Sequence, residues 1–230
     1  MAYHLILVPL ALIGIAVYFW ARKKNNLKVV AVVQPLNTVL VMIIAALGLL
    51  TPAANLGYTI FILASLLFAL IGDINNVDMT DEKTVMIGLV LFVFAYTIYP
   101  VAFTIYGGFI VPQDFIGIGI SVVLCALLIS YCWRGLEGMR IAGVVYGLVL
   151  FFLLSRAVST CFSDAFSQVQ AILITAGAAM IVLGDSQFAI ETFRKPTPPK
   201  WIIDLKIIGP VLYAGGQLLI GLSTAYFPAA

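Results

Sequence analysis

The sequence predicts an all-α, polytopic transmembrane bundle of about eight helices, and three observations support this. Of the 230 residues, 63% are hydrophobic and only 10% are charged, whereas a soluble domain carries roughly 25% charged residues. The mean hydropathy is +1.14. The apolar residues form continuous runs of about twenty rather than alternating segments of about ten, which favours helices over a transmembrane barrel. Because the connections are short, we expect one transmembrane domain over residues 1–230.

Each apolar run is long enough to cross a hydrocarbon core of roughly 30 Å. The first run does not resemble a cleaved signal peptide, because its positive charges, Arg22-Lys23-Lys24, follow the apolar residues instead of preceding them. The expected spans are residues 4–21, 29–50, 57–76, 84–106, 114–132, 138–159, 168–191 and 201–225.

Basic residues are confined to alternate loops, which predicts an orientation. The loops 51–56, 107–112 and 160–167 contain no Lys or Arg. By the positive-inside rule, the basic loops are cytoplasmic and both termini lie on the non-cytoplasmic side. We expect an integral protein of the plasma membrane. The net charge of +2 gives no indication of nucleic-acid binding. Beyond the first span, the cations at the basic face are Lys28, Lys83, Arg134, Arg140, Arg194, Lys195 and Lys200.

Two Gly-Asp pairs lie inside apolar spans, in the segments Leu70–Asp73 and Val182–Asp185. An acidic residue at the centre of a membrane helix costs roughly 2.5–3.5 kcal/mol on insertion scales, so two of them indicate a function. Both expected spans run from outside to inside, and each aspartate comes near its seventeenth or eighteenth residue. We therefore expect Asp73 and Asp185 at one depth, in the cytoplasmic third of the membrane.

Further polar residues are expected at this depth, which together predict a polar cavity open to the cytoplasm. Two carboxylates in one low-dielectric cavity should not both ionise freely, which leaves one acid and one base near neutral pH. That pair is suited to general acid–base catalysis. The alternative is that each aspartate only caps a helix end. The candidate substrate-binding residues around the catalytic pair are Gln34, Asn37, Asn76, Tyr96, Tyr99 and Ser186.

Other chemistries find little support. His4 is the only histidine, so a zinc hydrolase or a Ser-His-Asp triad is not expected, and no metal site is predicted. The three cysteines have no ligand-like spacing. Arg156 lies inside the sixth span, and we expect it to snorkel outward or to pair with Asp164 in the following loop.

Four stretches, in order, resemble the lysoplasmalogenase (YhhN-like) family of multi-span membrane proteins. Their order and spacing make the resemblance more specific than any one of them does. The stretches are residues 66–73 (LLFALIGD), 88–99 (GLVLFVFAYTIY), 145–148 (VYGL) and 177–193 (GAAMIVLGDSQFAIETF).

The resemblance implies cleavage of the vinyl-ether bond of lysoplasmalogens to a fatty aldehyde and a glycerophospho-base. It implies that Asp73 and Asp185 are the catalytic pair, that a lysophospholipid or another membrane lipid is the partner, and that no cofactor is needed. Protonation of the vinyl β-carbon gives an oxocarbenium ion to which water adds, a logic that parallels two-carboxylate glycosidases.

The chain departs from the family pattern at three positions. Gln34 stands where the family usually has Lys, Tyr96 where it usually has His, and Gly184 where Ser is more usual. Two alternatives therefore stay open: a non-catalytic lipid-binding member of the family, and a proton-coupled small-molecule transporter.

Overall fold

The computed structural model describes residues 3–52, 54–75, 82–108, 112–194 and 205–228, and these contain eight α-helices and no strands. Seven of their stretches are long and apolar enough to cross a membrane, and the 49-residue stretch Asp114–Phe162 holds two of the helices, so the expected class is confirmed. The helices are α1 (Val8–Lys23), α2 (Leu27–Leu47), α3 (Leu56–Asn75), α4 (Glu82–Gly107), α5 (Pro112–Leu136), α6 (Arg140–Ser159), α7 (Gln168–Phe193) and α8 (Leu205–Leu222).

Local signals fix several helix starts. Asn26 caps α2 by accepting a hydrogen bond from the backbone N–H of Val29, and Ser167 caps α7 by accepting one from Gln170. Pro9 lies in the first turn of α1, where its missing N–H removes no intrahelical bond. The helix bounds differ from the expected spans by a few residues at most ends, and residues 201–204 of the eighth expected span lie outside the described residues.

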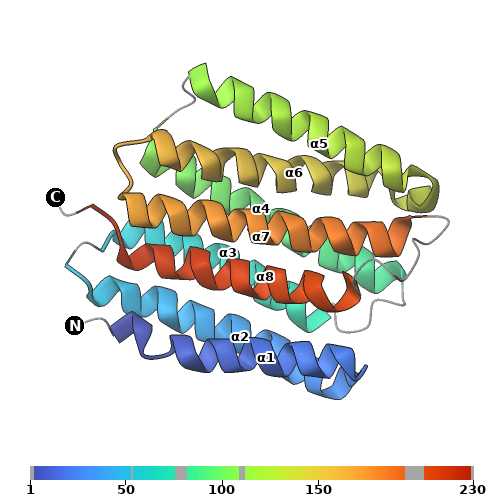
Figure 1. Ribbon diagram of the computed structural model, residues 1–230, viewed down its shortest axis with the longest axis horizontal. Helices are drawn as coiled ribbons and strands as arrows, with labels where there is room; N and C mark the ends of the chain where they lie inside the picture. The colour runs from blue at the N-terminus through green and yellow to red at the C-terminus, as the bar shows by residue number, and fades with distance from the viewer. Residues whose placement is uncertain (1–2, 53, 76–81, 109–111, 195–204, 229–230) are drawn as a thin grey trace.

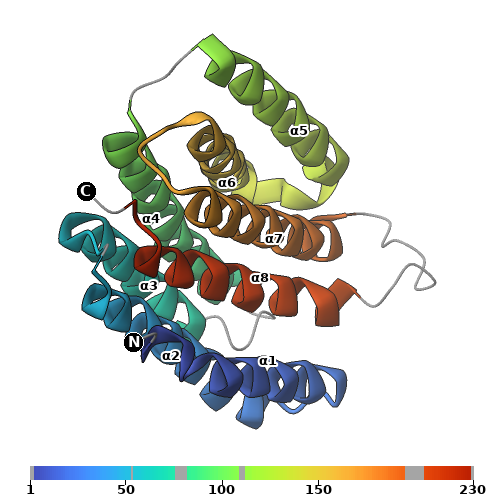
Figure 2. The ribbon, with the colours of Figure 1, turned by 60° about the vertical axis from the view of Figure 1, so that its left-hand side comes forward.

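Successive helices run antiparallel, and the two ends of the chain lie at the same end of the bundle (Figure 1). Turned by 60°, the bundle shows α5 at its edge, packed on α6 and α7 (Figure 2). The described basic residues Arg22, Lys28, Lys83, Arg134 and Arg194 lie at the end opposite the termini. Charge is therefore segregated along the bundle as the positive-inside pattern requires.

Helices α7 and α8 approach backbone to backbone because glycines meet at two levels. A Cβ on Gly184 would lie 2.5 Å from the carbonyl oxygen of Gly209, and a Cβ on Gly177 would lie 2.7 Å from that of Gly216. Small residues at such crossings let membrane helices pack closely. The glycine before Asp185 is therefore explained by this contact, and the contact fixes the position of Asp185 relative to α8.

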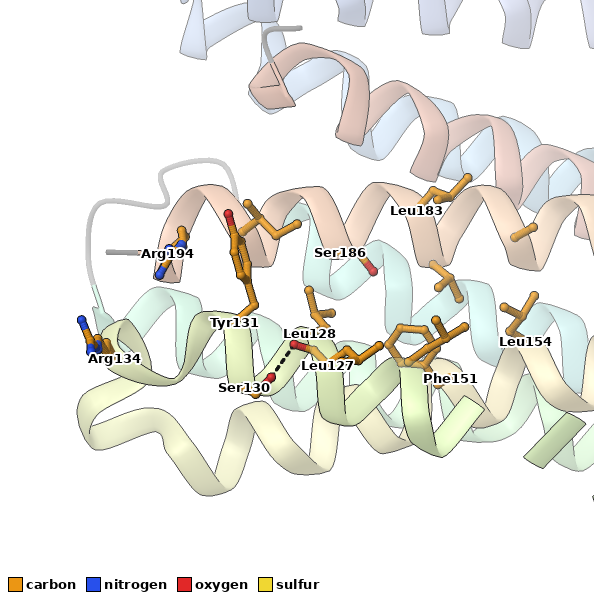
Figure 3. A pocket seen from close by; sticks show the side chains of 14 residues that line it. Leu127, Leu128, Ser130, Tyr131, Arg134, Phe151, Leu154, Leu183, Ser186 and Arg194 are labelled. Carbon is orange, nitrogen blue, oxygen red and sulfur yellow. Dashed lines mark hydrogen bonds between the residues drawn. The ribbon is translucent and has the colours of Figure 1, made fainter. Parts of the chain in front are cut away.

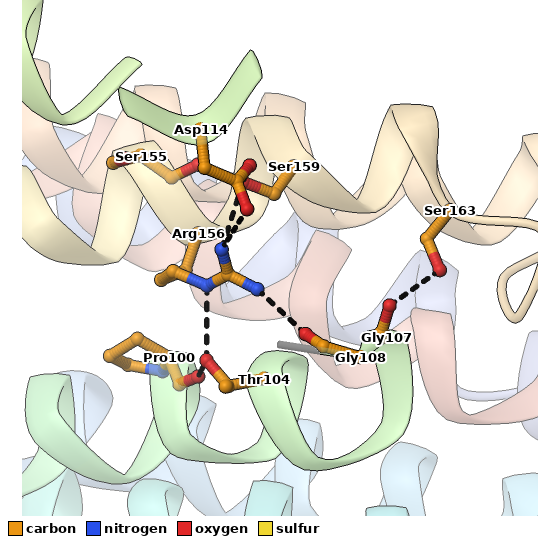
Figure 4. A network of polar contacts seen from close by, with 9 residues as sticks. All are labelled: Pro100, Thr104, Gly107, Gly108, Asp114, Ser155, Arg156, Ser159 and Ser163. Carbon is orange, nitrogen blue, oxygen red and sulfur yellow. Dashed lines mark hydrogen bonds and ion pairs between the residues drawn. The ribbon is translucent and has the colours of Figure 1, made fainter. Parts of the chain in front are cut away.

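The end of the bundle that holds the termini contains a buried ion pair, and the prediction made for its arginine was wrong (Figure 4). Arg156 of α6 neither snorkels nor pairs with Asp164; it is 2% exposed, and its Nη1 lies 2.7 Å from Oδ2 of Asp114 at the start of α5. Its Nε donates to Thr104 Oγ1 at 3.0 Å, and its Nη2 donates to the carbonyl of Gly108 at 3.1 Å. One guanidinium thus joins the ends of α4, α5 and α6, because a buried charge needs a partner.

Candidate active site

Asp73, near the end of α3, is fully buried, and both of its carboxyl oxygens accept hydrogen bonds. Oδ1 accepts from Gln34 Nε2 at 2.7 Å and from the Tyr213 hydroxyl at 3.0 Å. Oδ2 accepts from the hydroxyl of Thr38 at 2.5 Å. Three neutral donors from α2 and α8 therefore satisfy this carboxyl group inside the bundle, as a buried polar group requires.

Gln34 connects Asp73 to a positive charge on α1. Its Oε1 accepts hydrogen bonds from the Tyr18 hydroxyl at 2.8 Å and from Arg22 Nη2 at 3.3 Å. The guanidinium of Arg22 also lies over the Tyr18 ring, 5.4 Å from its centroid. Because two donors fix the oxygen of the amide, its nitrogen must face Asp73.

Helix α8 closes the other side of Asp73 with two residues one turn apart. Gln217 Nε2 donates to the Tyr213 hydroxyl at 2.6 Å, and that hydroxyl in turn donates to Asp73. Gln217 Oε1 lies 3.2 Å from the hydroxyl of Thr38. Each side chain of this cluster thus orients a neighbour.

Asp185, on α7, has a different environment. It is partly buried, and its Oδ2 accepts a hydrogen bond from the Tyr146 hydroxyl of α6 at 2.5 Å. It lines a cavity of about 30 Å³ together with apolar residues of α4, α5, α6 and α7. This space is comparable to the volume of a single water molecule. A water molecule can therefore be placed beside Asp185, whereas a larger group needs the lining side chains to move.

A row of four aromatic rings joins the two aspartates. The ring of Tyr213 meets that of Phe92 edge to face at 5.6 Å between centroids, and Phe92 stacks on Tyr96 at 5.8 Å. The Tyr96 ring lies 5.9 Å from that of Tyr146, which holds Asp185. The sequence led us to expect one polar cavity, whereas the structure has two clusters with an aromatic partition between them.

Gly72 makes room for this partition. A Cβ at Gly72 would lie 3.0 Å from the tip of the Phe92 ring, so a larger residue before Asp73 would press on the aromatic row. Both Gly-Asp pairs are thus explained in the same way: the glycine leaves room for a neighbouring helix, and the following aspartate points into the bundle.

Several predicted residues lie away from Asp73. Asn37 is buried against α1, where a Cβ on Gly14 would lie 2.7 Å from its Oδ1. Ser186 lines a lateral groove between α5, α6 and α7. Asn76 lies outside the described residues. Of the predicted substrate-binding residues, Gln34 is the one that bonds directly to Asp73.

The two predicted tyrosines of α4 are both buried. Tyr96 belongs to the aromatic row, where its ring lies 5.9 Å from that of Tyr146 between centroids. Tyr99 stacks on Phe103 at 6.3 Å between ring centroids. Neither hydroxyl has a hydrogen-bond partner among the described residues, which leaves two buried donors to satisfy.

Sequence reasoning missed two direct partners of Asp73, Thr38 and Tyr213, and it missed Tyr146 beside Asp185. It also missed the three residues that orient the partners of Asp73, which are Tyr18, Arg22 and Gln217. The i to i+4 spacings of Gln34 with Thr38 and of Tyr213 with Gln217 were usable signals, because each places two polar groups on one face of an apolar helix. No local signal assigns Tyr18, Arg22 or Tyr146 to an aspartate. Among the described residues, no group of three or more His, Cys, Asp or Glu side chains could hold a metal ion.

These features define a polytopic helical membrane protein with a candidate acid–base pair inside its bundle. The model of the YhhN family matches residues 29–224, which is most of the chain, and the chain belongs to this family. The family includes lysoplasmalogenases. No curated protein and no solved structure matches the chain.

Proposed function

We propose that this protein is an intramembrane hydrolase that cleaves the vinyl-ether bond of lysoplasmalogens, giving a fatty aldehyde and a glycerophospho-base. The observation that carries the proposal is the presence of two aspartates inside membrane helices, in unlike environments. We further propose that the site faces the cytoplasmic side of the plasma membrane, because the basic residues gather at the end of the bundle nearer to both aspartates.

The hydrogen bonds suggest different roles for the two carboxyl groups. Asp73 accepts three, and hydrogen bonds to a carboxylate favour its ionised form. Asp185 accepts one from Tyr146 and borders a cavity that is mostly apolar. We therefore assign the proton donor to Asp185 and a fixed negative charge to Asp73.

In the proposed reaction, the Asp185 carboxyl transfers its proton to the β-carbon of the vinyl ether, and an oxocarbenium ion forms. The charge of Asp73 stabilises this cation through the low-dielectric interior. Asp185, now a carboxylate, takes a proton from the attacking water, and a hemiacetal results. Asp185 then protonates the leaving glycerol oxygen and recovers a proton from the hemiacetal hydroxyl as the aldehyde forms.

The test is aldehyde release from a lysoplasmalogen by purified protein. We expect release by the parent and none above background by Asp73→Asn or Asp185→Asn. Asp164→Asn is the matched control, since Asp164 is exposed in the loop after α6. A folded parent that releases no aldehyde, or an Asp185→Asn variant as active as the parent, would contradict the proposal.

A non-catalytic lipid-binding protein is the second candidate. The observation that favours it is the saturation of Asp73 by donors of its own chain, which a structural network would also require. In that case Asp73→Asn leaves lipid binding intact, and neither the parent nor the variant consumes the lipid.

A further inference from the structure

A groove of about 1050 Å³ runs between α5, α6 and α7, on the side of α7 away from α8 (Figure 3). Its walls are mainly apolar, and it opens sideways, because several of its leucines are about half-exposed. This volume is at the upper end of the range for small-molecule sites. Its apolar lining includes Leu124, Leu127, Phe151, Leu154, Ala179 and Leu183.

Two guanidinium groups lie at one end of the groove. Arg134 belongs to the last turn of α5, and Arg194 follows the last residue of α7. The Arg194 guanidinium lies over the ring of Tyr131, 4.3 Å from its centroid. Figure 3 shows these three side chains together, with Leu154 and Leu183 towards the other end.

This arrangement matches the polarity of a membrane lipid. The arginines lie at the basic end of the bundle, where lipid phosphates meet the protein, and the apolar walls run from there into the membrane. Basic pockets between membrane helices bind lipid head groups, and arginine binds phosphate with paired hydrogen bonds.

We propose that this groove binds a phosphate-bearing membrane lipid, with the phosphate between Arg134 and Arg194 and one acyl chain between α5 and α7. This proposal concerns lipid binding alone and does not require the protein to hydrolyse the bound lipid.

The groove also lies next to the Asp185 cavity. Leu128 lines both spaces. Val182, three positions before Asp185 on α7, and Ser186, directly after it, line the groove. A lipid in the groove would therefore lie one side chain away from Asp185. The idea that this lipid is the substrate rests on the proposed function, whereas phosphate-dependent binding does not.

The test compares two single-chain lipids that the protein cannot hydrolyse at a vinyl ether: an ester-linked lysophosphatidylcholine and a monoacylglycerol with the same chain. Native mass spectrometry of the purified full chain would give both affinities. We expect the double variant Arg134→Ala/Arg194→Ala to lose at least about tenfold in affinity for the phospholipid, since hydrogen bonds to charged groups contribute strongly. Its affinity for the monoacylglycerol should stay unchanged.

Two matched controls isolate the groove. Arg140→Ala removes a cation from the same end of the bundle, where it lies over Trp133, 4.8 Å from the ring centroid, and should leave both affinities unchanged. Leu183→Trp fills the groove at an exposed position and should weaken both lipids, whereas Leu67→Trp, on α3 at similar exposure, should weaken neither.

The proposal is overturned if the double arginine variant binds the phospholipid as tightly as the parent, or loses both lipids equally. Its failure is distinguishable from that of the proposed function. Aldehyde release with arginine-independent lipid binding contradicts the groove alone, and arginine-dependent binding without any aldehyde contradicts the hydrolase alone.

Discussion

The side-chain amide of Gln34 lies between Arg22 and Asp73, with its nitrogen 2.7 Å from Asp73 Oδ1 and its oxygen 3.3 Å from Arg22 Nη2. A neutral group thus links a cation on α1 to an acid on α3. The family resemblance implies a lysine where this chain has Gln34. Here the positive charge comes from another helix, and the amide carries its orienting effect to the carboxyl group.

Replacing Gln34 tests this link. Gln34→Ala removes the acceptor of the Tyr18 hydroxyl, one of the two acceptors of Arg22 Nη2 and one donor to Asp73, so we expect a loss of about 1–3 kcal/mol in unfolding free energy. Gln34→Glu keeps the shape but sets a second carboxyl against Asp73, and the loss should be larger. Thermal unfolding in detergent measures both.

Asn75→Ala is the control for these variants, because Asn75 is exposed and, among the described residues, bonds only to the carbonyl of Ile71 in its own helix α3. Its midpoint of unfolding should match that of the parent. Equal midpoints for Gln34→Glu and the parent would show that the Gln34 contact does not hold the cluster.

Gly184→Ala tests the close approach of α7 and α8. The new Cβ would lie 2.5 Å from the Gly209 carbonyl oxygen, so the helices must separate, at a cost of about 1–3 kcal/mol. Gly119→Ala on α5 is the matched control, since a Cβ there meets nothing within 4 Å. We expect the control to be neutral or slightly stabilising, because alanine favours helix. Two variants with the same unfolding midpoint would refute the packing argument.

The membrane bundle follows from the sequence, because long apolar runs act locally along the chain. The common depth of the two aspartates stays a prediction from the loop charges. The partners of the aspartates do not follow from it. Tyr146 donates to Asp185 from another helix. In the sequence, Arg22 is only one of the cations that follow the first apolar run, and nothing there indicates its bond to Gln34. Which helices become neighbours depends on side-chain packing between them, and no spacing within one span reports it.

Asp114 shows the same limit. In the sequence, Asp114 is only the first residue of the fifth expected span, and the short separation in the chain favours Asp164 as the partner of Arg156. The packing of α5 on α6 instead brings Asp114 to Arg156 across 42 positions. Closeness in sequence therefore does not predict the ion-pair partner of a charged residue when helix packing brings a buried opposite charge to it.

The Arg156–Asp114 pair predicts an asymmetry between single and double replacement. Arg156→Met leaves the buried Asp114 carboxylate without its ion partner, and we expect a loss of about 3–5 kcal/mol. Arg156→Met/Asp114→Leu removes both charges, so most of that loss should be recovered. The unfolding midpoints of the two variants test this recovery. A double variant less stable than the single variant would contradict the prediction.

The orientation of the bundle can be tested with a cysteine that the chain already carries. Cys161 is exposed in the turn after α6, at the end that holds both termini, whereas Cys125 and Cys132 are buried on α5. If the basic end is cytoplasmic, a membrane-impermeant maleimide added to intact cells should label Cys161, and Cys161→Ser should abolish the labelling. Labelling that needs permeabilised cells would place the termini in the cytoplasm and the candidate active site towards the outer face, against the positive-inside rule.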